Sequence, residues 1–522
     1  MKALFPVSFL RTNLPVILAG LLLVFFASSC ATIAQPSESN NPPSGETAAV
    51  QATPTNTTQP DSSLPPTSTN TPPASDASAP PTPDVSDSLP LPHYTITATL
   101  NYAGHLLQVD ERIDYVNSSA DTLTELVMMV DTIYFPGVFS LISLAWIDSE
   151  ALPVYTWENA ILRLSLPLPL APGEQVSLRL GYTLNLPSPV PSQQVRPIPF
   201  GYTARQTNLV DWYPLIAPYQ SGVGWLAHPA GFFGEHQVYA VADFDIAIRL
   251  EDARPDLIVA ASVPAQEIDG WRHYQMQKAR NFVFSVSPHY IVESTQVGQV
   301  TVTSYTFSVH ASTGKTVLKT TADALALYSE LFSPYPRTSL SVVEADFLDG
   351  MEYDGLYFLS NGFYNLYQGA PGEYLVAIAV HETAHMWWYA LVGNDQALEP
   401  WLDEALCTYS ELLFYERYYP EAIDWWWSYR IHYYEPRGWV DGSIYNPAGY
   451  RAYRDAVYLN GAVFLHELRQ AIGPDVFIQF LQAYNNRYAY RIASASNFFE
   501  ILSEHSNTDL TTLLSAYFSA LR

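Results

Sequence analysis

The sequence predicts a multidomain protein: an N-terminal, antiparallel β-sandwich-like domain over residues 93–295, followed by a helix-rich α+β domain over residues 296–522. Two observations carry this prediction. Apolar and polar residues alternate in the segment 173–184, which is the pattern of half-buried strands. In the segment 321–332, apolar residues recur at helical spacing instead. A chain of 522 residues also exceeds the size of one compact domain.

The N-terminal β domain is predicted from its strands and turns. Residues 242–250 repeat the alternation found at 173–184, and Pro172-Gly173 supplies a turn signal directly before the latter segment. Short alternating strands bounded by such turn residues are typical of mainly antiparallel sheets. We therefore expect order to begin near His93 and the β domain to continue to about residue 295.

The second domain opens with a helix over residues 321–332, which Pro334 and Pro336 close. A short strand is expected next, at residues 340–345. Three further helices should follow, near residues 373–392, 400–418 and 456–472. This half of the chain is therefore expected to contain mostly helix and little strand.

Residues 1–30 predict an export signal rather than a folded element. Lys2 and Arg11 precede a 14-residue apolar run, residues 14–27, which is short for a membrane-spanning helix and typical of a signal peptide. Small residues then stand directly before Cys30, an arrangement that resembles the lipobox of bacterial lipoproteins. We expect lipid on Cys30 and a membrane-anchored protein at the bacterial cell surface; a plain secretory signal and an uncleaved anchor are the alternatives.

The segment after the signal is predicted to be a disordered tether. Residues 31–92 are rich in Pro, Ser and Thr and contain no lysine, arginine or aromatic residue. Such a composition buries too little apolar surface to offset the entropy cost of ordering the chain. We therefore expect a flexible stalk that holds the folded domains away from a membrane.

Charge and cysteine content exclude several classes of partner and site. The formal net charge of −27 disfavours nucleic acid and anionic lipid head groups as partners. The two cysteines, Cys30 and Cys407, are too few for a disulfide framework or a cysteine-based zinc site.

One stretch, HETAHMWWYALVGNDQALEPWLDEA, carries the pattern of a metal site. Four residues along a helix advance about 6 Å and just over one turn, so His381 and His385 project from the same face. Two imidazole nitrogens on one face can meet one zinc ion. Glu382 lies too far round the helix to be a third ligand and is well placed beside a metal-bound water.

The last glutamate of this stretch, Glu404, can supply the third ligand. The first helix is expected to end near Gly393-Asn394, and Pro400 can open the next helix. A short loop between antiparallel helices would bring Glu404 to the histidines and leave a fourth position for water, as a catalytic zinc site needs. The alternative is an ordinary core helix, but its buried polar side chains would then lack partners, at a cost of several kcal/mol.

The spacing of these residues resembles that of one enzyme family. H-E-x-x-H, eighteen residues and then a glutamate within W-L-x-E is similar to the zinc aminopeptidase N family of gluzincin metallopeptidases. Two more stretches agree: GMEYDG (350–355) resembles the family's G-x-M-E-N loop, and YLNGAVFLHEL (458–468) its Y-x-K-G-A motif. The resemblance covers roughly residues 93–522 and implies a thermolysin-like catalytic domain with one zinc ion, in a short form that lacks the family's helical C-terminal domain.

The resemblance also implies roles for individual residues. Glu382 would act as general base and Tyr458 would donate to the developing oxyanion. Glu352, with Gly350 and Met351, would bind the free α-amine of a peptide substrate. The implied activity is cleavage of the N-terminal residue from peptides.

Some positions depart from the family pattern or stay open. Tyr353, Asn460 and Ala405 stand where asparagine, lysine and glycine are usual. In the family, a residue of the N-terminal domain also contacts the amine, and we look for it between residues 199 and 212. Glu411, two helical turns after the third ligand, either orients His385 or is an exposed helix residue.

Three function classes therefore remain. The first is the aminopeptidase that the resemblance implies. The second is a zinc hydrolase of the same fold with another substrate, such as an endopeptidase or an epoxide hydrolase. The third is a surface binding protein without turnover, against which the intact set of predicted zinc and catalytic residues argues.

Overall fold

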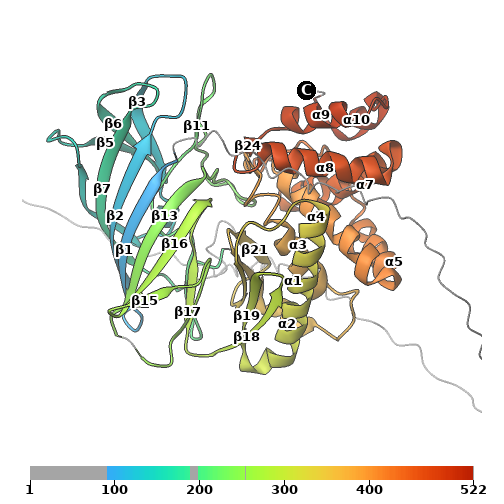
Figure 1. The fold of residues 1–522 in the computed structure, drawn as a ribbon, viewed down its shortest axis with the longest axis horizontal. Coiled ribbons are helices and arrows are strands. Elements are labelled where there is room, and N and C mark those ends of the chain that lie inside the picture. Colours follow the sequence, from blue (N-terminus) through green and yellow to red (C-terminus); the bar gives the residue numbers. More distant parts are fainter. Residues whose placement is uncertain (1–90, 189–197, 253, 521–522) are drawn as a thin grey trace, which may run out of the picture. The chain divides into compact units, whose positions relative to one another are not determined.

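The structure, a computed structural model, describes residues 91–188, 198–252 and 254–520, all of which belong to the compact unit Pro80–Arg522 (Figure 1). The predicted signal peptide, Cys30 and the tether up to residue 90 lie outside the described residues. None of the helices in the described ranges combines the length and the apolar character needed to cross a membrane.

The N-terminal region, blue to green in Figure 1, is built around a seven-stranded sheet in the order β15-β16-β13-β1-β2-β7-β4. Its strands are antiparallel to their neighbours except for the parallel pair β1 and β13. Their bounds are β1 (His93–Asn101), β2 (Leu106–Val116), β4 (Phe139–Trp146), β7 (Gln175–Asn185), β13 (Ala242–Leu250), β15 (Gln266–Ile268) and β16 (Trp271–Ala279).

Three smaller sheets accompany it in the described residues, in the orders β10-β3-β6-β5, β14-β17-β9-β8 and β11-β12. Their strands are β3 (Leu123–Met129), β5 (Val154–Glu158), β6 (Ile161–Leu170), β8 (Gly201–Tyr202), β9 (Thr207–Leu209), β10 (Leu215–Ile216), β11 (Tyr219–Gln220), β12 (Gly224–Trp225), β14 (Ile258–Ala261) and β17 (Phe284–Ser287). A 3₁₀ turn, η1, covers Asp131–Tyr134.

The period-two pattern explains how these sheets pack. In β1, Tyr94, Ile96, Ala98 and Leu100 are buried, while the residues between them are at least partly exposed. These side chains share one core with apolar residues of β3 and β6, so the seven-stranded sheet and the β3–β6 sheet pack face to face. Burying each large aliphatic side chain contributes about 1.5–3 kcal/mol. The predicted β-sandwich-like domain is thus observed.

The second region contains more strand than predicted. A five-stranded sheet runs in the order β18-β19-β20-β22-β21, where only residues 340–345 were expected to be extended. Its strands are β18 (Tyr290–Val297), β19 (Val300–Phe307), β20 (Ser339–Ala345), β21 (Gly350–Tyr353) and β22 (Leu356–Ser360). β20 and β22 are buried along their whole length, so they show no alternation to identify them. This sheet begins at Tyr290, before the predicted domain boundary near residue 295.

Helices pack against this sheet and form most of the remaining chain (Figure 1, yellow to red). They are α1 (Ala311–Leu331), α2 (Asn361–Leu366), α3 (Tyr374–Ala384), α4 (Trp401–Tyr418), α5 (Ile423–Trp425), α6 (Tyr450–Arg454), α7 (Gly461–Ile472), α8 (Pro474–Tyr488), α9 (Ala495–His505) and α10 (Thr511–Tyr517). The π-helical turns η5 (Trp426–Ile431) and η7 (Asp455–Asn460) and the 3₁₀ turns η3 (Ser308–His310), η4 (Pro420–Ala422) and η6 (His432–Tyr434) lie between them. β23 (Gly393–Asn394) pairs with β24 (Ile492–Ala493).

The helix that carries the histidines is shorter than predicted. We expected it to reach Gly393-Asn394, but α3 ends at Ala384. The amide of Ala390 then bonds the His385 carbonyl at 2.9 Å, and Tyr389 adopts a φ of 134°, which a right-handed helix does not contain. A tight turn therefore replaces the last two predicted helical turns. By contrast, α4 agrees with the predicted 400–418 to within a residue.

Candidate metal centre and active site

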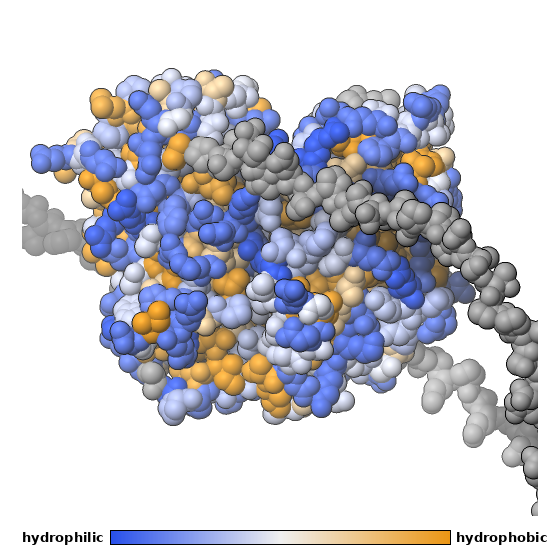
Figure 2. Space-filling model, in the orientation of Figure 1, coloured by the Kyte–Doolittle hydropathy of each residue, from blue (hydrophilic) through white to orange (hydrophobic). Residues whose placement is uncertain are grey.

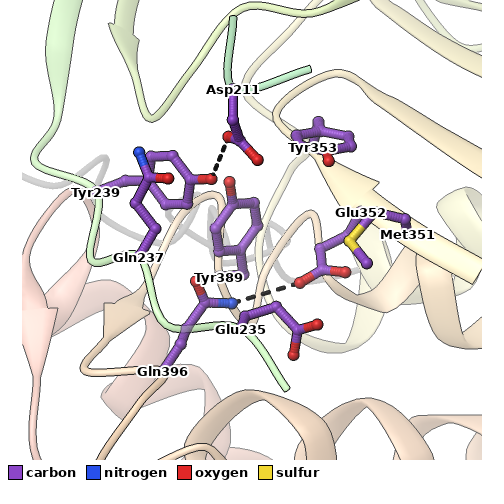
Figure 3. Close-up of a pocket in the computed structure, with 9 residues that line it drawn as sticks. All are labelled: Asp211, Glu235, Gln237, Tyr239, Met351, Glu352, Tyr353, Tyr389 and Gln396. Atoms are coloured by element: carbon purple, nitrogen blue, oxygen red, sulfur yellow. Dashed lines mark hydrogen bonds between the residues drawn. The ribbon is translucent and has the colours of Figure 1, made fainter. Parts of the chain in front are cut away.

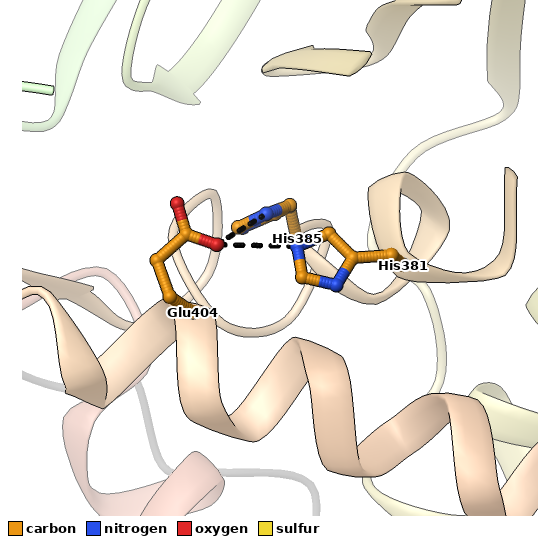
Figure 4. Close-up of side chains that lie close together, drawn as sticks. All are labelled: His381, His385 and Glu404. Atoms are coloured by element: carbon orange, nitrogen blue, oxygen red, sulfur yellow. Dashed lines mark hydrogen bonds and ion pairs between the residues drawn. The ribbon is translucent and has the colours of Figure 1, made fainter. Parts of the chain in front are cut away.

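The three predicted metal ligands come together where α3 ends and α4 begins. His381 lies in the last turn of α3, His385 caps that helix, and Glu404 lies in the first turn of α4. One ligand atom from each residue lies within 4.8 Å of the others, and all three residues are buried. Figure 4 shows both imidazole rings beside the Glu404 carboxylate.

The geometry fits a zinc ion. The Nε2 atoms of His381 and His385 lie 3.1 and 3.7 Å from the same Glu404 oxygen, Oε2. Tetrahedral zinc with bonds of about 2.0–2.2 Å separates its ligand atoms by about 3.3–3.6 Å. Both Nδ1 atoms are engaged elsewhere, that of His381 with Glu411 at 3.0 Å and that of His385 with the Trp388 carbonyl at 3.1 Å. The two Nε2 atoms are therefore the ones that face the metal position.

Glu411 orients a different histidine from the one expected. It is buried rather than exposed, and its Oε1 atom contacts Nδ1 of His381, not of His385. Arg430 donates to both oxygens of Glu411, at 3.0 and 2.7 Å. Burial alone would raise the pKa of Glu411, but Arg430 and His381 outweigh burial and lower it, so this carboxylate stays ionised. His385 instead uses a backbone carbonyl of the turn that follows α3.

Glu382 lies beside the predicted ligands in a closely fitted place. A Cβ atom on Gly350 would lie 2.0 Å from Glu382 Oε1, so any larger residue at position 350 would displace this carboxylate. Glu382 Oε2 is buried without a hydrogen-bond partner among the described residues. A buried carboxylate oxygen in this state is an acceptor for a water molecule. Burial raises the pKa of Glu382, partly offset by His381 and reinforced by Glu352.

Tyr458 contacts the third ligand from the opposite side. Its hydroxyl donates to Glu404 Oε1 at 2.6 Å, while Oε2 of the same carboxylate faces the histidines. The residue lies in the π-helical turn η7, a rare conformation that is frequent at functional sites. Burial and the neighbouring Glu404 raise the pKa of Tyr458, so its hydroxyl keeps the proton and can donate it.

A small acidic pocket adjoins this centre (Figure 3). Glu352, on β21, lines the pocket, and polar atoms of Glu352, Glu382 and His385 lie within 4.8 Å of one another. Gln396 donates to Glu352 Oε1 at 3.4 Å. Met351 also lines the pocket. Burial and the nearby carboxylate of Glu235 raise the pKa of Glu352, and a bound cation would relieve both effects.

The β-rich region supplies the far side of the pocket. Glu235 and Gln237, in the chain between β12 and β13, line it beside Glu352 (Figure 3). The family resemblance implies an amine-binding residue between positions 199 and 212, and from that segment Asp211 lines the pocket, where it accepts from the Tyr239 hydroxyl at 2.6 Å. Glu235 lies outside the expected segment. Its surroundings show no periodicity or motif that would have identified it from sequence.

The structure shows what the three residues that depart from the family motifs contact. Tyr353 is buried and packs edge-on against Phe358, with ring centroids 6.0 Å apart. Asn460 donates to a backbone carbonyl of the loop before α6, at 2.9 Å. Ala405 faces Gly461, where a Cβ atom would lie 2.5 Å from the Ala405 methyl group, so α4 and α7 approach closely here.

Part of the chain matches a known sequence family. Residues 316–517 match the model of the peptidase family M1 domain. Aminopeptidase M1-D of Oryza sativa subsp. japonica is 26% identical over 231 residues, which is 41% of this chain and 26% of the relative. Aminopeptidase M1-B of the same plant is 28% identical over 243 residues, 44% of this chain and 28% of the relative. The chain thus spans about a quarter of the length of the curated relatives it matches.

Comparison with solved structures supports the fold over most of the chain. An M1 zinc metallopeptidase from Deinococcus radiodurans superposes with a TM-score of 0.59 at 19% identity, covering 83% of this chain and 95% of that one. A mutant of that enzyme bound to a Tyr-Ser-Ala substrate gives 0.58 at 18% identity, with the same coverage. These findings confirm the predicted fold class and the family resemblance drawn from the three motifs.

Proposed function

We propose that this chain, whose residues 316–517 match the model of the peptidase family M1 domain, is a zinc-dependent aminopeptidase that hydrolyses the N-terminal peptide bond of peptides. One observation carries the proposal. Polar atoms of Glu352, Glu382 and the ligand His385 lie within 4.8 Å of one another. The amine nitrogen and the carbonyl carbon of one residue are only about 2.5 Å apart. A peptide whose ammonium group is held by Glu352 therefore has its first carbonyl beside the metal ligands.

The residues around the metal position would have separate roles in the hydrolysis. Bound zinc supplies a Lewis acid that lowers the pKa of a water molecule and polarises the scissile carbonyl. Glu382 takes a proton from the attacking water and passes it to the leaving amine. Tyr458 donates its hydroxyl to the carbonyl oxygen as negative charge develops there, which is where a preoriented dipole lowers the barrier most.

Two carboxylates would select the free N-terminus. Glu352 and Glu235 line the same pocket from the two halves of the chain. An ammonium group between them forms charge-assisted hydrogen bonds, whereas an N-acetylated peptide leaves both acids without a cation. Selection for a free amine separates this function from that of an endopeptidase or an epoxide hydrolase, neither of which requires an N-terminal ammonium group.

A substrate panel tests the proposal. We expect the protein to cleave aminoacyl and free-amine peptide substrates, to leave N-acetylated peptides nearly untouched, and to lose activity with a chelator until zinc is restored. The measurement is initial rate against each fluorogenic substrate. Faster cleavage of N-acetylated peptides than of free-amine ones would identify an endopeptidase. Zinc binding without turnover of any substrate would show that the protein is a binding protein and not an enzyme.

We also propose that lipid on Cys30 anchors the protein to the membrane outside the cytoplasm. Support comes from the sequence: an apolar run of 14 residues, small residues and then Cys30. We expect Cys30→Ser to move the protein from the membrane fraction to the soluble fraction without altering its specific activity, as measured by fractionation and labelling with radioactive palmitate. Equal membrane retention of the variant would contradict the anchor.

A further inference from the structure

Arg280 is a fully buried arginine from the β-rich region whose guanidinium group contacts backbone carbonyls. It directly follows β16 and is 1% exposed. Nε donates to the carbonyl of Ala390 at 3.2 Å and Nη2 to that of Leu391 at 3.2 Å. Further bonds reach the carbonyls of Tyr239, at 2.9 Å from Nη1, and Arg491, at 2.7 Å from Nη2. One side chain thus joins four carbonyls from three separate parts of the chain.

Two of these carbonyls belong to the turn that follows the metal-binding helix. That turn, residues 386–392, contains the Trp388 carbonyl, which accepts from Nδ1 of the predicted ligand His385 at 3.1 Å. The amide of Ala390 donates to the His385 carbonyl at 2.9 Å. The position of His385 Nε2 therefore depends on where this turn lies, and Arg280 holds the turn from outside.

The turn needs an external restraint because its backbone is strained. Tyr389 has a φ of 134°, in the region that favours glycine, although it carries a large side chain. Such a conformation persists only where the surroundings fix it. Asn281, the next residue after Arg280, donates to the Tyr389 hydroxyl at 2.5 Å. In Figure 3 the Tyr389 ring lies at the centre of the pocket.

We propose that Arg280 is a positioning residue for the metal centre: it fixes the turn at 386–392, and thereby aims His385 at the zinc position. The inference rests on the proposed function, since it assumes a zinc ion between His381, His385 and Glu404. Through Arg280, the β-rich region takes part in metal binding, in addition to forming one wall of the substrate pocket. Arg280 is not among the residues that line the substrate pocket, and it acts on the metal centre through the turn.

The site is shaped for a guanidinium group. Arginine offers five N–H donors in a planar fork, whereas lysine offers three on one nitrogen and cannot span these carbonyls. Gly393 lies directly against the fork, and a Cβ atom there would be 2.7 Å from Arg280 Cζ. Arg280→Lys is therefore expected to behave like Arg280→Met rather than to rescue it, and Gly393→Ala should displace the guanidinium without removing any polar group.

The test measures zinc affinity by competition with a chromophoric chelator, together with hydrogen exchange of residues 386–393 in the metal-free protein. For Arg280→Met and Gly393→Ala we expect about 10- to 100-fold weaker zinc binding, the usual effect of losing a partner that orients a metal ligand. Exchange at 386–393 should rise in both variants. Glu411→Gln, which alters the direct partner of His381, provides the benchmark for such a loss.

A second inter-domain arginine provides the matched control. Arg205 pairs with Asp346 across the same two regions but has no bond to the turn. We expect Arg205→Met to lower stability without changing zinc affinity or exchange at 386–393. Folded Arg280→Met and Gly393→Ala proteins with the zinc affinity of the parent would overturn the inference. A parent protein that itself bound no zinc would contradict the proposed function. Failure of the proposed function and failure of the inference on Arg280 therefore give different results.

Discussion

Replacing Glu382 by glutamine should lower kcat by about 10²- to 10⁴-fold, the usual contribution of a general acid–base group, while zinc stays bound. The amide has the shape of the carboxylate, so it still fits against Gly350, but it cannot accept and return a proton. Initial rates on an aminoacyl substrate and the zinc content of the purified variant check the two halves of this expectation.

The same variant tests which groups hold the metal. Glu352, Glu382 and His385 also form a set of possible ligands within 4.8 Å of one another, beside the set formed by His381, His385 and Glu404. If Glu382 were a ligand, Glu382→Gln would weaken zinc binding as well as turnover. Glu416→Gln, on the surface of α4 and paired with Arg469 at 2.8 Å, is the matched control and should change neither. Substantial residual kcat in Glu382→Gln would remove Glu382 from the role of base.

The clustering of His381, His385 and Glu404 was predictable from sequence because much of its geometry is local. A spacing of four residues places His381 and His385 on one face of a helix, because one helical turn takes 3.6 residues. The expectation for Glu404 assumed a short connection after Gly393-Asn394; the observed connection, residues 385–400, is longer, but α4 still begins where Pro400 indicated and brings Glu404 to the histidines. The β-rich region was predictable for a similar reason, since alternation with period two survives in most of its long strands.

The remaining parts of the site depend on contacts between distant segments. The early end of α3 follows from a turn that Arg280 holds, 110 residues away along the chain from Ala390. One of the two alternatives for Glu411 placed it beside His385, but that histidine bonds a carbonyl of this turn, and Glu411 contacts His381 instead. Glu235 lies in an aperiodic segment. Single-sequence patterns carry no information on such pairings, because each partner alone is an ordinary polar residue.

Removing the carboxylate of Glu352 should have the second large effect, and a selective one. A buried ion pair that loses one partner costs about 3–5 kcal/mol, so kcat/KM for free-amine substrates should fall by about 10²- to 10³-fold or more in Glu352→Ala. The loss should be far smaller for N-acetylated peptides, which present no ammonium group to this pocket. The measured quantity is the ratio of kcat/KM values for one peptide with a free and with an acetylated N-terminus.

The isosteric variant Glu352→Gln separates charge from shape in this pocket. It can keep the contact with Gln396, which lies 3.4 Å from Glu352 Oε1, and fills the same volume, so a loss as large as that of the alanine variant assigns the effect to the carboxylate charge. Zinc content should be unchanged in both variants. A parent protein that cleaved both forms of the peptide equally well would show that Glu352 holds no amine. The first carbonyl would then reach the metal by some route other than an anchored N-terminus.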